Sequence, residues 1–134
     1  FMNSGGQRAD GSMTAPNSQA VRRCISQALK TSKVHPDEIS AINGHLTATK
    51  KDPDEIYNWS RALHRKGNDF PAINSLKSMI GHGLAASGSL ECVATVLQLK
   101  YQQVFGNINC EDIHPDILEH ISAEKIVQQK TQLV

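Results

Sequence analysis

Hydrophobic side chains recur at helical spacing in three stretches of the chain. Residues 18–31 and 52–66 each carry one apolar stripe, which is typical of a helix that packs a single face against a core. At the start of the second stretch, Asp52 is expected to cap the helix and Glu55 to reach back to that cap. Residues 83–104 are apolar on nearly every side, and a helix without a polar face is expected to be buried.

Two short apolar runs, residues 39–43 and 71–74, have the length and composition of buried strands. Each run leads into a loop that carries a histidine, His45 after the first and His82 after the second. Parallel neighbouring strands end at the same edge of a sheet, where open α/β folds place their sites. The pattern therefore predicts an α/β fold with both imidazoles on the same side of the sheet, close enough for one small oxygen to contact both.

Composition narrows the class of protein. A chain of 134 residues has room for one domain, and its 39% hydrophobic but only 4% aromatic content indicates an aliphatic core. The net charge of +1, without a basic run or an aromatic platform, gives no indication of nucleic-acid binding. The longest apolar stretch, residues 93–99, is too short to span a bilayer, and residues 1–6 lack a signal-peptide core, so a cytoplasmic protein is expected.

The three cysteines, Cys24, Cys92 and Cys110, are scattered along the chain, and no pair has the spacing of metal ligands. Reduced thiols of a cytoplasmic protein are a simpler interpretation than a disulfide framework. Cys24 lies on the apolar stripe of the first helix and Cys92 within the apolar helix, so both are expected to be packing residues. Residues 1–16 are rich in Gly, Ser and Asn and are expected to form a loop or to be disordered.

The loop around His82 has a plain structural interpretation. Gly81 and Gly83 flank the histidine, and a Gly/Ser-rich turn with one helix-capping histidine accounts for the stretch by itself. The matching position of His45, after the preceding strand, favours a functional site over that interpretation.

Two motifs carry a family resemblance. Residues 43–49 read Asn-Gly-His-Leu-Thr-Ala-Thr and resemble the Asn-Ala-His-Gly-Thr-x-Thr motif of the β-ketoacyl synthases. Residues 77–82 resemble their Lys-Ser-x-x-Gly-His motif, and residues 85–91 resemble the Gly-Ala-Ala-Gly-x-x-Glu that follows it. Residues 10–16 resemble the upstream Asp-x-x-x-Met-Thr-x-Pro segment. The order and spacing are most similar to those of the elongating synthases that depend on acyl carrier protein.

The resemblance implies the fold: one half of a thiolase-like layered α/β/α sandwich, with a mixed sheet and a buried central helix. Family members are much longer, and their nucleophilic cysteine lies in the N-terminal half. Residues 1–134 are therefore interpreted as the C-terminal domain of a ketoacyl synthase, a fragment that lacks the nucleophile. Alone, this fragment is expected to condense no thioesters, although the full-length parent would be an acyltransferase.

The resemblance also assigns catalytic roles. His45 and His82 would donate Nε2–H hydrogen bonds to the enolate oxygen that forms when a malonyl thioester loses carbon dioxide. Lys77 would fix the electrostatics of the site. Glu91 is the one charge in its apolar stretch, and because a carboxylate is rarely buried unpaired, Lys77 is its expected partner.

Substrate and partners follow from the same resemblance. Thr47 and Thr49 would hydrogen-bond the phosphopantetheine arm of acyl carrier protein, so that no resident cofactor and no metal are expected. The expected partners are acyl carrier protein, acyl and malonyl thioesters, the N-terminal half of the same enzyme and a second copy in a homodimer, with no nucleic acid and no membrane span. Leu46 stands where the family has glycine, and leucine tolerates a positive φ poorly, so the local turn is expected to differ or to carry strain.

Two alternatives stay open at this point. A thiolase-type half shares the fold and a Gly-His followed by Ser-Gly, here residues 81–82 and 87–88, although Thr47, Thr49 and Lys77 favour the synthase. A non-catalytic scaffold or chain-length partner domain that has lost its nucleophile is the other. A cysteine in a small-residue turn upstream of Phe1 would distinguish synthase from scaffold.

Overall fold

The computed structural model describes residues 16–128. The expected loop at residues 1–16, and nearly all of the upstream motif, therefore lie outside the described residues. The elements follow one another in the order α1 (Ser18–Ser32), η1 (Pro36–Glu38), β1 (Ala41–Asn43), α2 (Asp52–Leu63), β2 (Ala72–Asn74), α3 (Lys77–Ile80), η2 (Leu84–Ala86), α4 (Ser87–Tyr101), α5 (Pro115–Leu118) and η3 (Ala123–Lys125).

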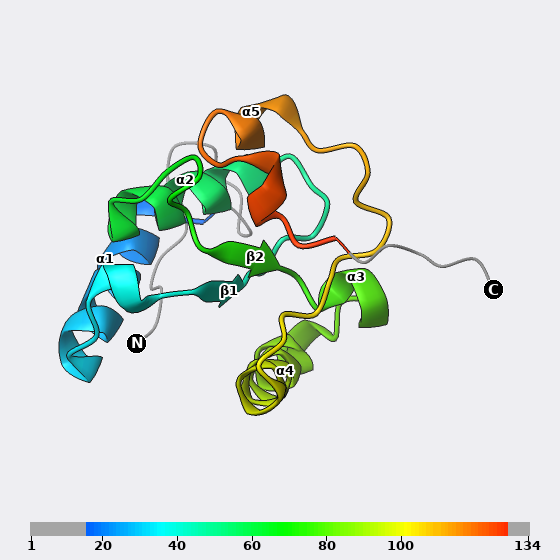
Figure 1. The fold of residues 1–134 in the computed structure, drawn as a ribbon, viewed down its shortest axis with the longest axis horizontal. Coiled ribbons are helices and arrows are strands. Elements are labelled where there is room, and N and C mark those ends of the chain that lie inside the picture. The colour runs from blue at the N-terminus through cyan, green and yellow to red at the C-terminus, as the bar shows by residue number, and fades with distance from the viewer. Residues whose placement is uncertain (1–15, 129–134) are drawn as a thin grey trace.

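The two strands are parallel neighbours, as the sequence predicts. Ile42 pairs with Ile73 and Asn43 with Asn74, and α2 forms the crossover between them. An isolated parallel bridge between Ile73 and Ile126 adds the last described segment to the other side of β2. In Figure 1, α2 lies on one side of the strand pair and α4 on the other. The shared register brings the loops after β1 and β2 out at one edge.

An aliphatic core fills the space between the strands and α2. Its buried members are Ile42, Ile56, Leu63, Phe70, Ile73, Ile121 and Ile126. The stripe of α2 faces this core as predicted, with Trp59 partly buried against it, and α1 packs beside α2. Full burial of side chains of this size contributes about 1.5–3 kcal/mol each, so this cluster is what fixes β1 and β2 against α2.

Both ends of α2 differ from the expectation. Its N-cap is Lys51, without a side-chain capping bond, because the carboxylates of Asp52 and Glu55 are engaged elsewhere. The helix ends at Leu63, where His64 takes a left-handed conformation with φ of 56°. The next residue, Arg65, then turns back and donates from Nη1 to the carbonyls of Pro36 (3.1 Å) and Ile39 (2.6 Å). This guanidinium ties the end of α2 to the turn that precedes β1.

The expected buried helix is shorter and, in this chain, is not buried. α4 begins at Ser87 after the 3₁₀ turn η2, and only Ser87, Ala94 and Gln98 on it are buried. Its exposed apolar side chains include Leu90, Val93, Val96, Leu97, Leu99 and Tyr101. The helix is apolar on most sides, as the sequence predicts, but within residues 16–128 no segment covers this face. Cys92, expected to be a packing residue, is exposed as well.

Among the described residues, no helix is both long enough and apolar enough to cross a lipid bilayer.

Candidate active site

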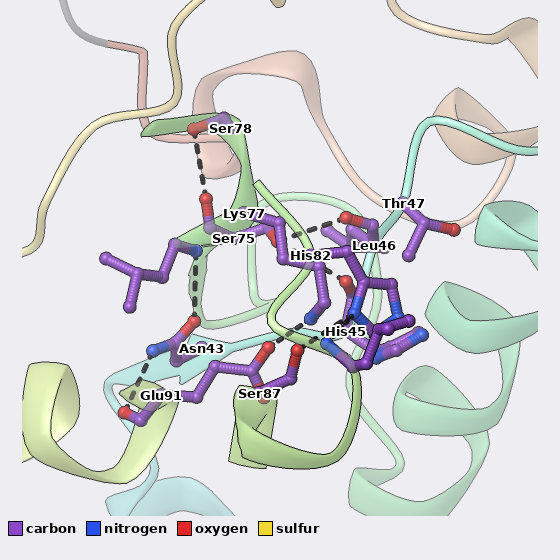
Figure 2. Close-up of polar contacts among 12 residues, drawn as sticks. Asn43, His45, Leu46, Thr47, Ser75, Lys77, Ser78, His82, Ser87 and Glu91 are labelled. Carbon is purple, nitrogen blue, oxygen red and sulfur yellow. Dashed lines mark hydrogen bonds and ion pairs between the residues drawn. The ribbon is translucent and has the colours of Figure 1, made fainter. Parts of the chain in front are cut away.

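The two histidines meet at the edge where β1 and β2 end. The ring centroids of His45 and His82 lie 5.2 Å apart, with an angle of 81° between the ring planes. Figure 2 shows both imidazoles in the space between the β1 loop and the start of α4. Both residues are exposed in this chain. The prediction that the two imidazoles lie close together on the same side of the sheet is confirmed by this geometry.

His82 is held by its Nδ1 atom. The backbone N–H of Leu84 donates to Nδ1 at 2.9 Å, and the hydroxyl of Ser87 lies 2.9 Å from the same atom. Because a backbone N–H can only donate, Nδ1 must be the acceptor, and the proton of the neutral ring must sit on Nε2. Gly81, with φ of 76°, provides the left-handed turn just before the histidine. The arrangement leaves an Nε2–H donor free for a ligand.

The loop that carries His45 is shaped by Glu55. The two carboxylate oxygens of Glu55 accept hydrogen bonds from the backbone N–H groups of His45 (2.8 Å) and Leu46 (3.0 Å). On its other side the loop is tied to β2, because the N–H of Gly44 donates to the carbonyl of Asn74 at 2.7 Å. The expectation that Glu55 completes a capping box was wrong: its carboxylate supports the histidine loop instead.

Asp52 supports the next part of the His45 loop in the same way. Its carboxylate accepts from the backbone N–H groups of Thr47 (3.1 Å) and Ala48 (3.0 Å). The hydroxyl of Thr47 donates to that of Thr49, 3.2 Å away, and Thr49 in turn reaches Asp52. Ala48 takes the positive φ, 57°, while Leu46 does not. The strain expected at Leu46 is therefore absent, and its side chain packs against the core.

Lys77 and Glu91 form an ion pair next to His82, as predicted. Lys77 begins α3 and Glu91 lies on α4, and their side chains are 7% and 19% exposed. Figure 2 shows the carboxylate of Glu91 meeting the ammonium group from the α4 side. A buried charge without its partner costs several kcal/mol, so each group accounts for the presence of the other.

Two polar residues at the strand ends connect these parts, and sequence reasoning missed both roles. Asn43, the last residue of β1, donates from Nδ2 to the carbonyl of Glu91 (3.1 Å) and accepts from the N–H of Leu76 (3.4 Å). Ser75, directly after β2, donates to the carbonyl of Leu46 at 3.0 Å. A polar residue that closes an apolar run was the available signal, because a polar side chain in a buried position needs hydrogen-bond partners.

Comparison with known proteins decides the family. Residues 1–111 match the sequence profile of the family described as "Beta-ketoacyl synthase, C-terminal domain". The chain belongs to this β-ketoacyl synthase family.

Ketosynthases from several pathways are similar to it. Polyketide synthase PksN of Bacillus subtilis is 30% identical over 122 residues, which cover 89% of this chain and 2% of that protein. The chloroplastic 3-oxoacyl-acyl-carrier-protein synthase II of Arabidopsis thaliana is 38% identical over 98 residues, 72% of this chain and 18% of that protein. The ketosynthase from module 1 of the bacillaene synthase of Bacillus amyloliquefaciens has a TM-score of 0.82 at 25% identity, covering 99% of this chain and 24% of that one.

The β-ketoacyl synthase chain thus spans about a quarter or less of the length of these relatives. Its neighbours among solved structures are ketosynthase domains, so the fold is the thiolase-like α/β fold that the sequence indicated. The named relatives are synthases of fatty acids or polyketides, which favours the synthase interpretation over a thiolase-type half.

The three cysteines of this chain differ in exposure. Cys92 is exposed on α4, and Cys24 and Cys110 are half-buried. Burial, and then the nearby charges of Glu111 and Asp52, raise the pKa of the Cys110 thiol. A raised pKa reduces the thiolate fraction, which is the reactive form.

Proposed function

We propose that this chain is the C-terminal half of a 3-oxoacyl-acyl-carrier-protein synthase, which condenses malonyl-acyl carrier protein with an acyl-enzyme in fatty acid or polyketide synthesis. The observation that carries the proposal is the pair His45 and His82, with ring centroids 5.2 Å apart and Nδ1 of His82 already occupied. An imidazole held in this way offers Nε2–H to an oxygen and keeps its orientation before the substrate arrives.

In the proposed reaction the malonyl thioester loses carbon dioxide. The bond between the carboxylate carbon and the α-carbon breaks, and its electron pair moves onto the thioester carbonyl to give an enolate. Nε2–H groups of His45 and His82 would donate to the enolate oxygen and stabilise its negative charge. The α-carbon then attacks the carbonyl of the acyl-cysteine, forms the new carbon–carbon bond and expels the cysteine thiolate.

Lys77 and Glu91 would set the charge around this step. Paired with each other, they leave no net charge beside His82, whereas an unpaired ammonium would stabilise the malonyl carboxylate that has to leave. The pair also joins α3 to α4, so that the His82 loop between these helices is closed at its base.

Thr47 and Thr49 are the proposed contacts of the phosphopantetheine arm carried by acyl carrier protein, and no resident cofactor is proposed. Their hydroxyls lie on the loop directly after His45, with Asp52 holding the backbone beneath them. Thr49 is exposed and Thr47 half-buried, so both hydroxyls lie near the surface of this chain.

The exposed apolar face of α4 supports a further part of the proposal: the N-terminal half of the same enzyme covers it. Side chains such as Val93, Val96 and Leu99 are 57–65% exposed. A contiguous exposed apolar surface of this kind typically marks an interface with another protein segment. That half would also supply the nucleophilic cysteine. The resemblance to the family is the ground on which we also propose that the parent enzyme is homodimeric and cytoplasmic.

The test compares the complete synthase with variants in this chain. With acyl and malonyl carrier-protein thioesters, the complete enzyme is expected to form β-ketoacyl product, measured by mass spectrometry, and the 134-residue chain alone is expected to form none. His82→Ala should lower the rate of malonyl decarboxylation by about 100-fold or more, the loss typical of removing one oxyanion donor. The matched control is His114→Ala, on an exposed turn before α5. A decarboxylation rate unchanged by His82→Ala would instead favour the scaffold alternative.

A further inference from the structure

Ser87 is the first residue of α4, and its side chain turns inward at a point where the neighbouring residues 81–86 and 88–90 are exposed. The residue is 7% exposed, and its Oγ lies 2.9 Å from Nδ1 of His82. In the motif that residues 85–91 resemble, an alanine stands at this position. The hydroxyl is therefore absent from that motif, and the reaction proposed above gives it no role.

We propose that Ser87 is a positioning residue that holds the imidazole ring of His82 in its orientation, while the N–H of Leu84 sets its Nε2–H form. Nδ1 accepts the N–H of Leu84, so it carries no proton, and the Ser87 hydroxyl takes the donor role toward it. A proton moved to Nδ1 would face the N–H of Leu84 and lose that hydrogen bond, whereas the Ser87 hydroxyl could also accept. This inference rests on the proposed function, because it concerns the same imidazole.

The hydroxyl supplies something that the backbone donor lacks. Leu84 lies in an exposed 3₁₀ turn, is 79% exposed itself and has a φ of 48°, which is uncommon for a leucine. Ser87 begins a helix of 15 residues that Glu91 fastens to Lys77 and Asn43. Figure 2 shows Ser87 and Glu91 reaching from the same helix toward His82 and Lys77. The imidazole is thus fixed to the rigid element rather than to the turn alone.

The tautomer of His82 can be read directly by nitrogen NMR of protein labelled with ¹⁵N-histidine, with the His82 signals identified from their absence in His82→Gln. We expect a single Nε2–H form in the native chain. In Ser87→Ala the Nε2–H form should persist, because Leu84 still donates to Nδ1, but ¹⁵N relaxation of the imidazole should give a lower order parameter, because the ring has lost one of its two hydrogen bonds. Ser89→Ala, the same change on an exposed residue of α4, and Ser87→Thr, which keeps the hydroxyl, should both match the native chain.

A second measurement separates positioning from a merely structural role. In the complete synthase, Ser87→Ala should slow malonyl decarboxylation about 3- to 10-fold and leave acyl transfer to the nucleophile unchanged, with Ser87→Thr restoring the rate. Circular dichroism checks the fold of each variant. If Ser87→Ala did not fold, Ser87→Cys, with a weak S–H donor of similar size, would take its place in both measurements.

A ring order parameter in Ser87→Ala equal to that of the native chain, or an equal loss in both half-reactions, would overturn the inference. The NMR result does not depend on condensation. If His82→Ala left decarboxylation unchanged, the proposed function would fail while the ring order parameter still decided whether Ser87 positions the ring.

Discussion

Asn43 Nδ2 donates a hydrogen bond of 3.1 Å to the backbone carbonyl of Glu91, which joins the end of β1 to the middle of α4. The same amide accepts the N–H of Leu76, after β2. One side chain therefore touches both strand ends and the helix that carries Ser87 and Glu91. The geometry of the His82 loop depends on a residue outside that loop.

Replacing Asn43 should disturb the site more than the fold. Asn43→Ala removes three hydrogen bonds of a half-buried side chain, to Glu91, Thr95 and Leu76, so we expect a loss of about 1–2 kcal/mol in the free energy of unfolding, measured with urea. Asn43→Asp should be worse, because it retains the acceptor for Leu76 but sets a carboxylate against the carbonyl of Glu91. Equal stability of the two variants would contradict the role given to the Nδ2 donor.

Replacing Glu55 should loosen the His45 loop. Glu55→Ala leaves the N–H groups of His45 and Leu46 without their acceptor, and we expect faster amide hydrogen exchange at both, together with a loss of condensation by the complete synthase of about tenfold or more. Asp54→Asn is the control, because Asp54 lies on the same turn and its ion-pair partner, Lys51, is exposed. Exchange at His45 that is no faster than in Asp54→Asn would argue against this support.

Lys77 and Glu91 should show strong coupling in a double-mutant cycle. Lys77→Met leaves the Glu91 carboxylate mostly buried without its cation, and we expect a loss of about 3–5 kcal/mol in the free energy of unfolding. The double variant Lys77→Met with Glu91→Met should recover most of this loss, since no uncompensated charge remains. Single losses that simply add in the double variant would show that the pair is not coupled.

The Cys110 thiol should be the less reactive of two cysteines at mildly alkaline pH. Burial, then Glu111 and Asp52, raise its pKa above the ordinary 9.0, so iodoacetamide at pH 8 should modify the exposed Cys92 first, as followed by mass spectrometry. The unfolded thiol ionises at lower pH than the folded one. Stability that is present below pH 9.0 should therefore fall as pH rises through the folded pKa, and Cys110→Ser should weaken this fall. Faster modification of Cys110 than of Cys92 would contradict the burial argument.

The strand pair, the proximity of His45 and His82 and the ion pair of Lys77 with Glu91 could be predicted, because each follows from a periodic pattern or from a charge in an apolar stretch. The exposure of α4 could not be predicted, because an apolar pattern indicates that a helix is buried but not which segment buries it. Glu55 was misassigned for a different reason. A carboxylate in the first turn of a helix suits a cap and a preceding loop equally, and only the path of residues 44–49 decides between them.

Glu55 and Ile56 are consecutive residues with different structural roles. The carboxylate of Glu55 holds the histidine loop, while Ile56, 1% exposed, fills the core. A single inserted residue between them would turn the rest of α2 by about 100° and could not keep both contacts, because an α-helix has 3.6 residues per turn. The start of α2 should therefore tolerate neither insertions nor deletions. Libraries meant to alter the loop should vary residues 46–50 and keep Glu55 and Ile56 adjacent.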